Sequence, residues 1–245
     1  CSVNIPTIVV SGGPMLTGKY KGKNIGTSDI WRFSEAVRSG HMTEEEMEVT
    51  EACMARSRGH CAVMGTASTM ACMVESLGLS LPENAAIPAA DSRRKVLAQL
   101  SGIRIVEMVN EDLKPTDILT RKAFENAIKV NAAIGGSTNF VLHLLAIAGR
   151  VGVALSLKDF DVHSDDIPLI ANLQPSGEHF VEDLYYAGGL PAVMKEILPS
   201  LHKDALTVNG KTVEENCSSV ACYDRNVIAT AEQPFNDISG IVVVK

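Results

Sequence analysis

The sequence predicts an α/β fold, a layered α/β/α domain in which helices flank a mostly parallel sheet. Helical patterns dominate the 245 residues and are separated by short glycine corners, and a buried strand pattern runs directly into one such corner. Hydrophobic residues make up 46% of the chain, enough to bury a substantial core. No Pro/Ser-rich linker divides the chain, so one main domain is expected.

The first expected element is a strand over residues 5–10 (IPTIVV), an apolar, β-branched run that stops at the turn sequence Ser11-Gly12-Gly13-Pro14. The capping box Thr43-Glu44-Glu45-Glu46 predicts a helix that runs to about residue 56. Further helices are expected over residues 66–78, 91–100 with Gly102 as the stop, 120–134, 139–148, 180–187 and 191–201, and Asn209-Gly210 predicts a hairpin over residues 207–213.

Composition excludes several classes of protein. A net charge of -7 and a pI near 5.4 argue against a nucleic-acid surface. The longest apolar stretch, residues 140–148, is far too short to span a membrane. The six cysteines (1, 53, 61, 72, 217 and 222) include no C-x-x-C pair and follow no secretory signal, which favours a reducing, cytoplasmic setting and disfavours a structural zinc site.

Cys61 is the candidate metal ligand. It follows Gly59-His60 in the connection between two expected helices, and the amides at the next helix start would favour its thiolate. The simpler interpretation is a small buried hydrophobe. A nucleophile is the third, but it needs a base such as His60 or His143 in a position that sequence does not define.

A second glycine corner opens into the helix expected from residue 139. Gly135, Gly136, Ser137 and Thr138 are the candidate substrate-binding residues, because amides at a helix N-terminus can receive a carboxylate. A plain helix-start corner is the alternative. Arg93 and Arg94 are weaker candidates for the same anion, since Asp91 and solvent are simpler partners.

Several segments together resemble the dihydroxy-acid dehydratase and phosphogluconate dehydratase family. They are VSGGPM (10–15), GHCAVMGTASTMACMVESLGLSLP (59–82), LKPTDILTRKAFENAI (113–128), GGSTN (135–139), VLHLLAIAGR (141–150) and AGG (187–189). Three further segments have sequences that resemble the sugar-acid branch, such as arabinonate dehydratases, more than the branched-chain dihydroxy-acid enzymes. They are residues 29–33 (DIWRF), 84–89 (NAAIPA) and 91–94 (DSRR).

The resemblance implies a hydro-lyase that removes water from a 2,3-dihydroxy carboxylate, an aldonate or another dihydroxy acid, to give a 2-keto acid. It implies an iron–sulfur cluster that acts as Lewis acid on the leaving hydroxyl, with Cys61 as one ligand. A [2Fe-2S] cluster is expected, and a [4Fe-4S] cluster is the less favoured alternative. It also implies Mg²⁺, which stabilises the enolate. A small-molecule sugar acid or dihydroxy acid is the expected partner, with no nucleic acid and no membrane, and the protein is expected to be a homodimer or higher homo-oligomer.

The resemblance covers the N-terminal half of a family member. Residues 1–205 are expected to form the N-terminal dehydratase domain, incomplete at its start, and residues 206–245 to end it or lead to a missing C-terminal β-rich domain. The family's Cys-Asp-Lys motif, later glutamate ligand and serine base have no counterpart here, so no catalytic residue is assigned and the chain alone is expected to be inactive. A cysteine-nucleophile hydrolase and a non-catalytic anion-binding or assembly module remain the alternatives.

Overall fold

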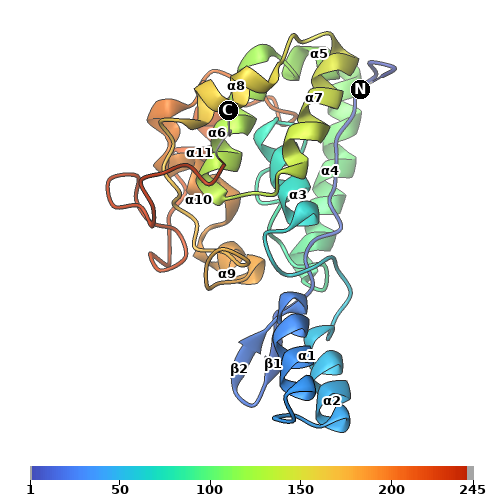
Figure 1. The fold of residues 1–245 in the computed structure, drawn as a ribbon. Coiled ribbons are helices and arrows are strands. Elements are labelled where there is room, and N and C mark those ends of the chain that lie inside the picture. Colours follow the sequence, from blue (N-terminus) through green and yellow to red (C-terminus); the bar gives the residue numbers. More distant parts are fainter. Residues whose placement is uncertain (1, 242–245) are drawn as a thin grey trace.

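The computed structural model describes residues 2–241, which form a mixed α/β structure dominated by helices (Figure 1). A small lobe of two strands and two helices projects from a larger helical body. The lobe contains β1 (Gly18–Tyr20), β2 (Lys23–Ile25), η1 (Thr27–Asp29), α1 (Ile30–Arg38) and α2 (Glu44–Met54). The body contains α3 (Thr66–Ser76), α4 (Ser92–Asn110), α5 (Pro115–Ile118), α6 (Arg121–Ile134), α7 (Asn139–Val151), α8 (Leu157–Ser164), α9 (Val181–Ala187), α10 (Gly189–Glu196), η2 (Leu198–Ser200) and α11 (Val213–Cys217).

The expected mostly parallel sheet is not formed by the described residues. They contain one two-stranded antiparallel sheet, in which Gly18 pairs with Ile25 and Tyr20 with Lys23. Residues 5–10 belong to no strand, and the Val9 amide donates instead to the Leu79 carbonyl at 2.8 Å. A β-branched run becomes a strand only beside a partner strand. The layered α/β/α expectation was therefore wrong for this part of the chain, although the mixed α/β class is confirmed.

Local signals predicted the helix ends well. Thr43 caps α2, accepting a hydrogen bond from the Glu46 amide at 3.1 Å, and α6 ends at Gly135 in the left-handed region with φ of 62°. The Asn209-Gly210 hairpin is confirmed as an isolated antiparallel bridge between Leu206 and Thr212. The expected stop at Gly102 was wrong, because α4 continues to Asn110; one glycine on an exposed helix face costs only about 1 kcal/mol.

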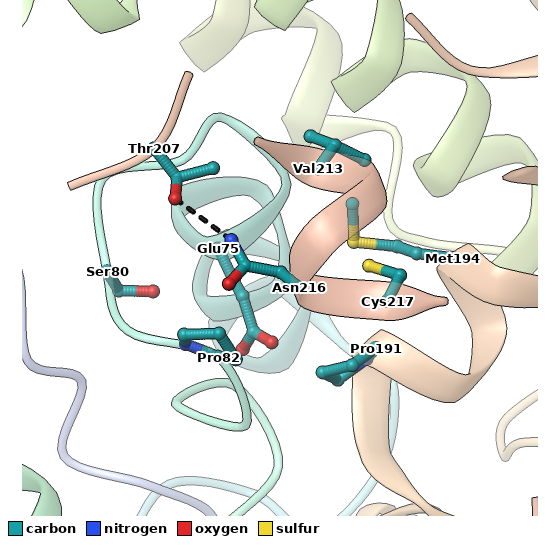
Figure 2. Close-up of a pocket in the computed structure, with 9 residues that line it drawn as sticks. All are labelled: Glu75, Ser80, Pro82, Pro191, Met194, Thr207, Val213, Asn216 and Cys217. Carbon is teal, nitrogen blue, oxygen red and sulfur yellow. Dashed lines mark hydrogen bonds between the residues drawn. The ribbon is translucent and has the colours of Figure 1, made fainter. Parts of the chain in front are cut away.

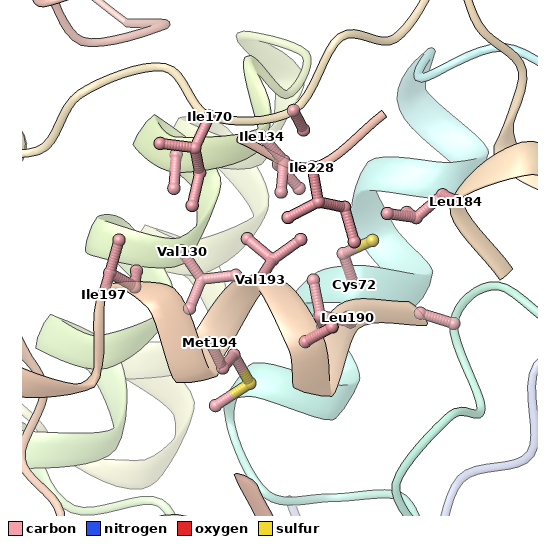
Figure 3. Close-up of a cluster of buried hydrophobic side chains, with 14 of the residues drawn as sticks. Cys72, Val130, Ile134, Ile170, Leu184, Leu190, Val193, Met194, Ile197 and Ile228 are labelled. Atoms are coloured by element: carbon pink, nitrogen blue, oxygen red, sulfur yellow. The ribbon is translucent and has the colours of Figure 1, made fainter. Parts of the chain in front are cut away.

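Helix α6 lies at the centre of the body and is buried along most of its length. One cluster of buried side chains joins it to α9 and α10, and includes Val130, Leu184, Val193 and Ile228 (Figure 3). A second cluster joins α6 to α3, α7 and α8. Helix α3 begins just after the Cys61 loop, and α7 begins at the glycine corner of residues 135–138. Packing of both helices against α6 therefore fixes the positions of these two candidate site segments.

The lobe has a small core of its own. Ile25, Phe33 and Met54 are buried there, and the Tyr20 and Phe33 rings meet edge to face with centroids 6.1 Å apart. The lobe thus has buried side chains of its own, and the Phe180 ring of the body packs closely against its Gly26. The lobe leads at Met54 directly into the loop that carries Cys61.

Replacing Phe124 by alanine should lower the free energy of unfolding by about 3–5 kcal/mol, because its ring is fully buried on α6 and its removal leaves a cavity. Val96→Ala on α4 is the matched surface change: Val96 is 53% exposed, and the loss should stay within about 0.5 kcal/mol. Denaturant unfolding of both variants measures the difference. Equal losses would contradict the assignment of α6 to the core.

Candidate functional site

The Cys61 thiol is exposed in the loop between α2 and α3, next to the first glycine corner. The His60 amide donates to the Gly13 carbonyl at 3.1 Å, and the Met15 amide donates to the His60 carbonyl at 2.8 Å. Pro14 and His60 thus form a parallel bridge. The sequence expectation that Cys61 lies in an open position between two helices is met, so its interpretation as a buried hydrophobe was wrong.

Gly59 makes this contact possible. Its φ of 131° lies in the region that favours glycine, and a Cβ at this position would overlap the backbone of Pro14 and Met15. Gly12, by contrast, is exposed and has no atom within 4 Å of the place where its Cβ would be. The first corner is therefore packed against His60 on the side of Pro14 and Met15, whereas Gly12 on its other side is exposed.

A second segment holds the other side of the Cys61 loop. The Met64 amide donates to the Gln174 carbonyl at 2.7 Å, and the Val181 amide donates to the Ala62 carbonyl at 2.8 Å. The loop is thus fixed between residues 13–15 and residues 174–181. An exposed thiol on a loop fixed from both sides has a defined position, which a metal ligand requires.

The second glycine corner is tied to the start of α3, a few residues after Cys61. The Ser137 amide donates to the Thr69 hydroxyl at 2.9 Å, and the Asn139 side-chain amide donates to the Thr66 hydroxyl at 2.8 Å. The Thr66 and Ser137 hydroxyls are 3.3 Å apart. The N-terminus of α3 therefore connects Cys61 with the residues predicted to bind substrate.

The four predicted substrate-binding residues differ in what they offer. Gly135 is the C-cap residue of α6. Gly136 is buried, and a Cβ at this position would overlap the Asn131 side chain. Ser137 is half-buried and Thr138 is exposed. Only Ser137 and Thr138 have side chains that a ligand can reach, and the two glycines set the backbone that carries them.

His60 is held as a neutral ring. Its Nδ1 lies 3.0 Å from the Cys61 carbonyl oxygen, which can only accept, so Nδ1 is the donor. Burial, followed by the positive charge of Arg94, lowers the pKa of His60. With the proton on Nδ1, the basic nitrogen is Nε2, which is buried and has no hydrogen-bond partner among the described residues. The described residues therefore contain no His60–thiol hydrogen bond of the kind that a cysteine-nucleophile hydrolase needs.

A buried polar network that sequence reasoning did not assign lies behind the first corner. Glu75 on α3 accepts the amides of Glu83 and Ala85 at 2.8 and 2.7 Å, and the Asn84 side chain between them bonds Ser11. Burial raises the pKa of Glu75 to about 7. The one available signal was a glutamate within the otherwise small and apolar α3 sequence TASTMACMVES.

Arg94 belongs to this network and is not available to a substrate. Its guanidinium is buried and donates to the Asn84 side chain at 3.1 Å, the Asn84 carbonyl at 2.8 Å and the Ile87 carbonyl. Arg93 lies outside and pairs with Glu83 at 2.9 Å. Arg94 is therefore not available to a carboxylate, while Arg93 is exposed at the surface with Glu83 as its ion-pair partner.

Of the described cysteines, Cys61 is exposed, and Cys53 and Cys222 are half-buried. No group of three or more His, Cys, Asp or Glu side chains between residues 2 and 241 is arranged to hold a metal ion. Cys72 and Cys217 are buried, and burial raises the pKa of Cys217 to about 12. Cys1 lies outside the described residues. Cys61 fits the role of one thiolate ligand, while a complete ligand set is not formed here.

Within residues 2–241, none of the helices combines the length and the apolar character that crossing a membrane requires.

Gly59→Ala should lower the free energy of unfolding by more than about 3 kcal/mol, because the new Cβ adds backbone strain and overlaps Pro14 and Met15. Gly12→Ala is the control, because Gly12 lies in the segment that faces Gly59 but has no atom within 4 Å of its Cβ position. The free energy of unfolding of this variant should stay within about 0.5 kcal/mol of the wild type. Chemical denaturation of both variants tests this. Tolerance of alanine at position 59 would mean that the two segments are further apart than described.

The buried carboxyl of Glu75 should make stability depend on pH. Its pKa is raised from 4.5 to about 7 in the folded protein, so the folded state holds the proton more strongly than the unfolded chain. The resulting stabilisation is fully present below pH 4.5 and is lost as pH rises through 7, a change on the order of 3 kcal/mol.

Glu75→Gln cannot titrate, so the melting temperature of the wild type minus that of this variant should decrease between pH 5 and pH 8. Thermal denaturation at both values measures it, and Glu48→Gln serves as control, because that side chain is exposed on α2 in the lobe, away from Glu75. A difference that does not change with pH would show that Glu75 keeps an ordinary pKa.

Comparison with known proteins gives the site a context. Residues 1–216 match the family described as Dihydroxy-acid/6-phosphogluconate dehydratase N-terminal. The chain is 55% identical over 247 residues to an L-arabinonate dehydratase of Rhizobium leguminosarum bv. trifolii, and 54% identical over 250 residues to an L-arabonate dehydratase of Azospirillum brasilense. It is 44% identical over 245 residues to a dihydroxy-acid dehydratase of Acetivibrio thermocellus.

These alignments cover 99–100% of the chain but 42–44% of the length of each relative. The chain thus spans less than half of the curated proteins that it matches. The family match covers most of the chain, both glycine corners and the Cys61 loop. The chain therefore belongs to the dihydroxy-acid/6-phosphogluconate dehydratase family, whose N-terminal region it contains.

Proposed function

We propose that the chain is the N-terminal part of a dehydratase that removes water from a 2,3-dihydroxy carboxylate to give a 2-keto acid. The single observation that carries the proposal is the exposed Cys61 thiol on a loop fixed between residues 13–15, next to the Ser11–Gly13 corner (residues 11–13), and residues 174–181. Family membership supports the reaction class. A sugar acid is the proposed substrate, because identity is higher to the relatives named arabinonate or arabonate dehydratase than to the one named dihydroxy-acid dehydratase.

The reaction has two difficulties, a weakly acidic proton on C2 and a poor leaving group on C3. A [2Fe-2S] cluster would supply a Lewis acid for the hydroxide that leaves, and Mg²⁺ would stabilise charge on the enolate. Cys61 would hold the cluster as one thiolate ligand; the remaining cluster ligands, the Mg²⁺ ligands and the base would come from residues outside this chain. A [4Fe-4S] cluster is the alternative.

The second corner is proposed to orient the substrate. Ser137 and Thr138 offer hydroxyls, and the first amides of α7 give this end a partial positive charge that favours a carboxylate. Gly135 and Gly136 keep side chains away from the approach. Because Thr66 is bonded to Asn139, a substrate held at this corner would lie beside the helix that follows Cys61.

The remaining features of the proposal concern the whole protein. Residues 1–205 would form the N-terminal dehydratase domain, with residues 206–245 leading to a C-terminal β-rich domain. Any mostly parallel sheet would then need partner strands from outside the described residues, with residues 5–10 as one candidate strand. The whole protein is proposed to be a homodimer or higher homo-oligomer. The cysteine pattern supports the proposal that it is cytoplasmic. Branched-chain dihydroxy-acid dehydration is the second candidate, supported by the 44% identical relatives.

The test is Cys61→Ser in the full-length protein, purified without oxygen. Iron and acid-labile sulfide per chain should fall, and keto-acid formation should drop by more than about 100-fold, because a lost ligand costs at least as much as a lost ligand-supporting residue. Cys53→Ser is the matched control: Cys53 is half-buried in the lobe, and its loss should leave iron content unchanged.

The substrate panel comprises pentonates, hexonates and 2,3-dihydroxyisovalerate. Preference for a pentonate or hexonate is expected, and preference for 2,3-dihydroxyisovalerate would favour the second candidate. Full iron content and activity in Cys61→Ser would refute the assignment of Cys61.

A further inference from the structure

We propose that Asn84 is a positioning residue of this site, which sets the Ser11–Gly13 corner against the Cys61 loop. The importance of that corner for dehydration rests on the proposed function; the mechanical link itself does not. Asn84 lies 73 residues from Ser11 in sequence and its side chain is fully buried. Among the described residues its side-chain hydrogen bonds go to Ser11 and Arg94, and not to Cys61 or the predicted substrate-binding residues, so its effect on them is expected through the corner.

Both polar atoms of the Asn84 side chain are used at the corner. Its Oδ1 accepts the Ser11 backbone amide at 2.9 Å, and its Nδ2 donates to the Ser11 hydroxyl at 2.9 Å. Oδ1 also accepts Arg94 at 3.1 Å. A buried amide with its donor and acceptor both satisfied by one residue fixes that residue in position and in orientation.

Asn84 is itself held by Glu75. The amides on either side of it, those of Glu83 and Ala85, each donate to a different Glu75 carboxylate oxygen. This clamp supports an unfavourable backbone, since Glu83 adopts φ of 71° although it is not a glycine. Figure 2 shows Glu75 at the wall of a small cavity with Ser80, Asn216 and Cys217, so the clamp is anchored in the interior of the body.

The Ser11–Gly13 corner in turn contacts the loop that carries the Cys61 thiol. Gly13 is packed closely against Arg94 and the Ala89 amide, each 2.9 Å from where its Cβ would be. From Gly13 the hydrogen bond to the His60 amide leads directly to Cys61. Asn84 and Arg94 therefore support one side of the corner, and the other side supports the loop that carries the thiol.

The test uses Asn84→Ala and Asn84→Asp in the full-length protein. Aspartate keeps the acceptor for the Ser11 amide and Arg94, and the Ser11 hydroxyl can turn to donate to it. Hydrogen exchange of a peptide covering residues 8–16 should be at least about tenfold faster in Asn84→Ala, and within about threefold of the wild type in Asn84→Asp, since only alanine removes the bonds. With a sugar acid, kcat/KM should fall by about tenfold to 100-fold in Asn84→Ala and recover in Asn84→Asp.

Asn126→Ala is the matched control. Asn126 is also a fully buried asparagine that ties down a distant segment, through bonds with the His202 amide and carbonyl at 2.7 and 3.0 Å. It should speed exchange at residues 200–205 and leave residues 8–16 unchanged. Faster exchange at residues 8–16 in Asn126→Ala as well would overturn the proposal, because the effect of Asn84 would then be general destabilisation. Unchanged exchange there in Asn84→Ala would also overturn it, because Asn84 would then not hold the corner.

If Asn84→Ala does not fold, Ser11→Ala replaces it, since it removes the hydroxyl partner and leaves the Glu75 clamp intact. Exchange should then rise at residues 8–16 and stay unchanged at residues 81–90, and unchanged exchange at residues 8–16 would again overturn the proposal. The exchange result does not depend on turnover. A protein that shows the selective exchange but no dehydration would sustain the link and refute the proposed function.

Discussion

The close backbone contact between Gly59 and the Pro14–Met15 segment (residues 14–15) is the constraint on which the site depends. It places His60 in register with Pro14, and it leaves the next residue, Cys61, exposed at the surface. A side chain at position 59 would separate the two segments. Chain segments 45 residues apart thus meet mainly through backbone atoms, and the Ser57 hydroxyl adds one side-chain contact by accepting the Leu16 amide at 2.9 Å.

Sequence reasoning succeeded where the signal was local. The capping box at Thr43 and the left-handed Gly135 are short-range patterns, and both define helix ends in the structure. The sheet failed because strand pairing is a long-range property: residues 5–10 have strand composition, yet within the described residues they meet the end of α3 and not a strand. Similarly, Gly102 is a stop signal only where tertiary contacts do not continue the helix.

The site shows the same division. Cys61 and the corner at residues 135–138 were predictable from short motifs, and the structure joins them through Thr66 and Thr69 on one helix. Asn84 was not predictable as a partner of Ser11, because 73 residues separate them and neither has a distinctive local pattern. The resemblance to a family indicated that these segments belong together, but not which contacts hold them.

The buried charges behind the corner explain why it is rigid and what it offers chemically. A carboxylate inside a protein is costly unless it is hydrogen-bonded, and Glu75 uses both oxygens to hold one loop. The described hydrogen bonds of Arg94 all go to neutral oxygens, so its charge is balanced only at longer range by Glu75 and Asp91. That positive charge helps to keep His60 neutral. The same charge would favour the carboxylate and enolate that the proposed reaction brings to this side of the molecule, so one buried arginine can serve both the shape and the electrostatics of the site.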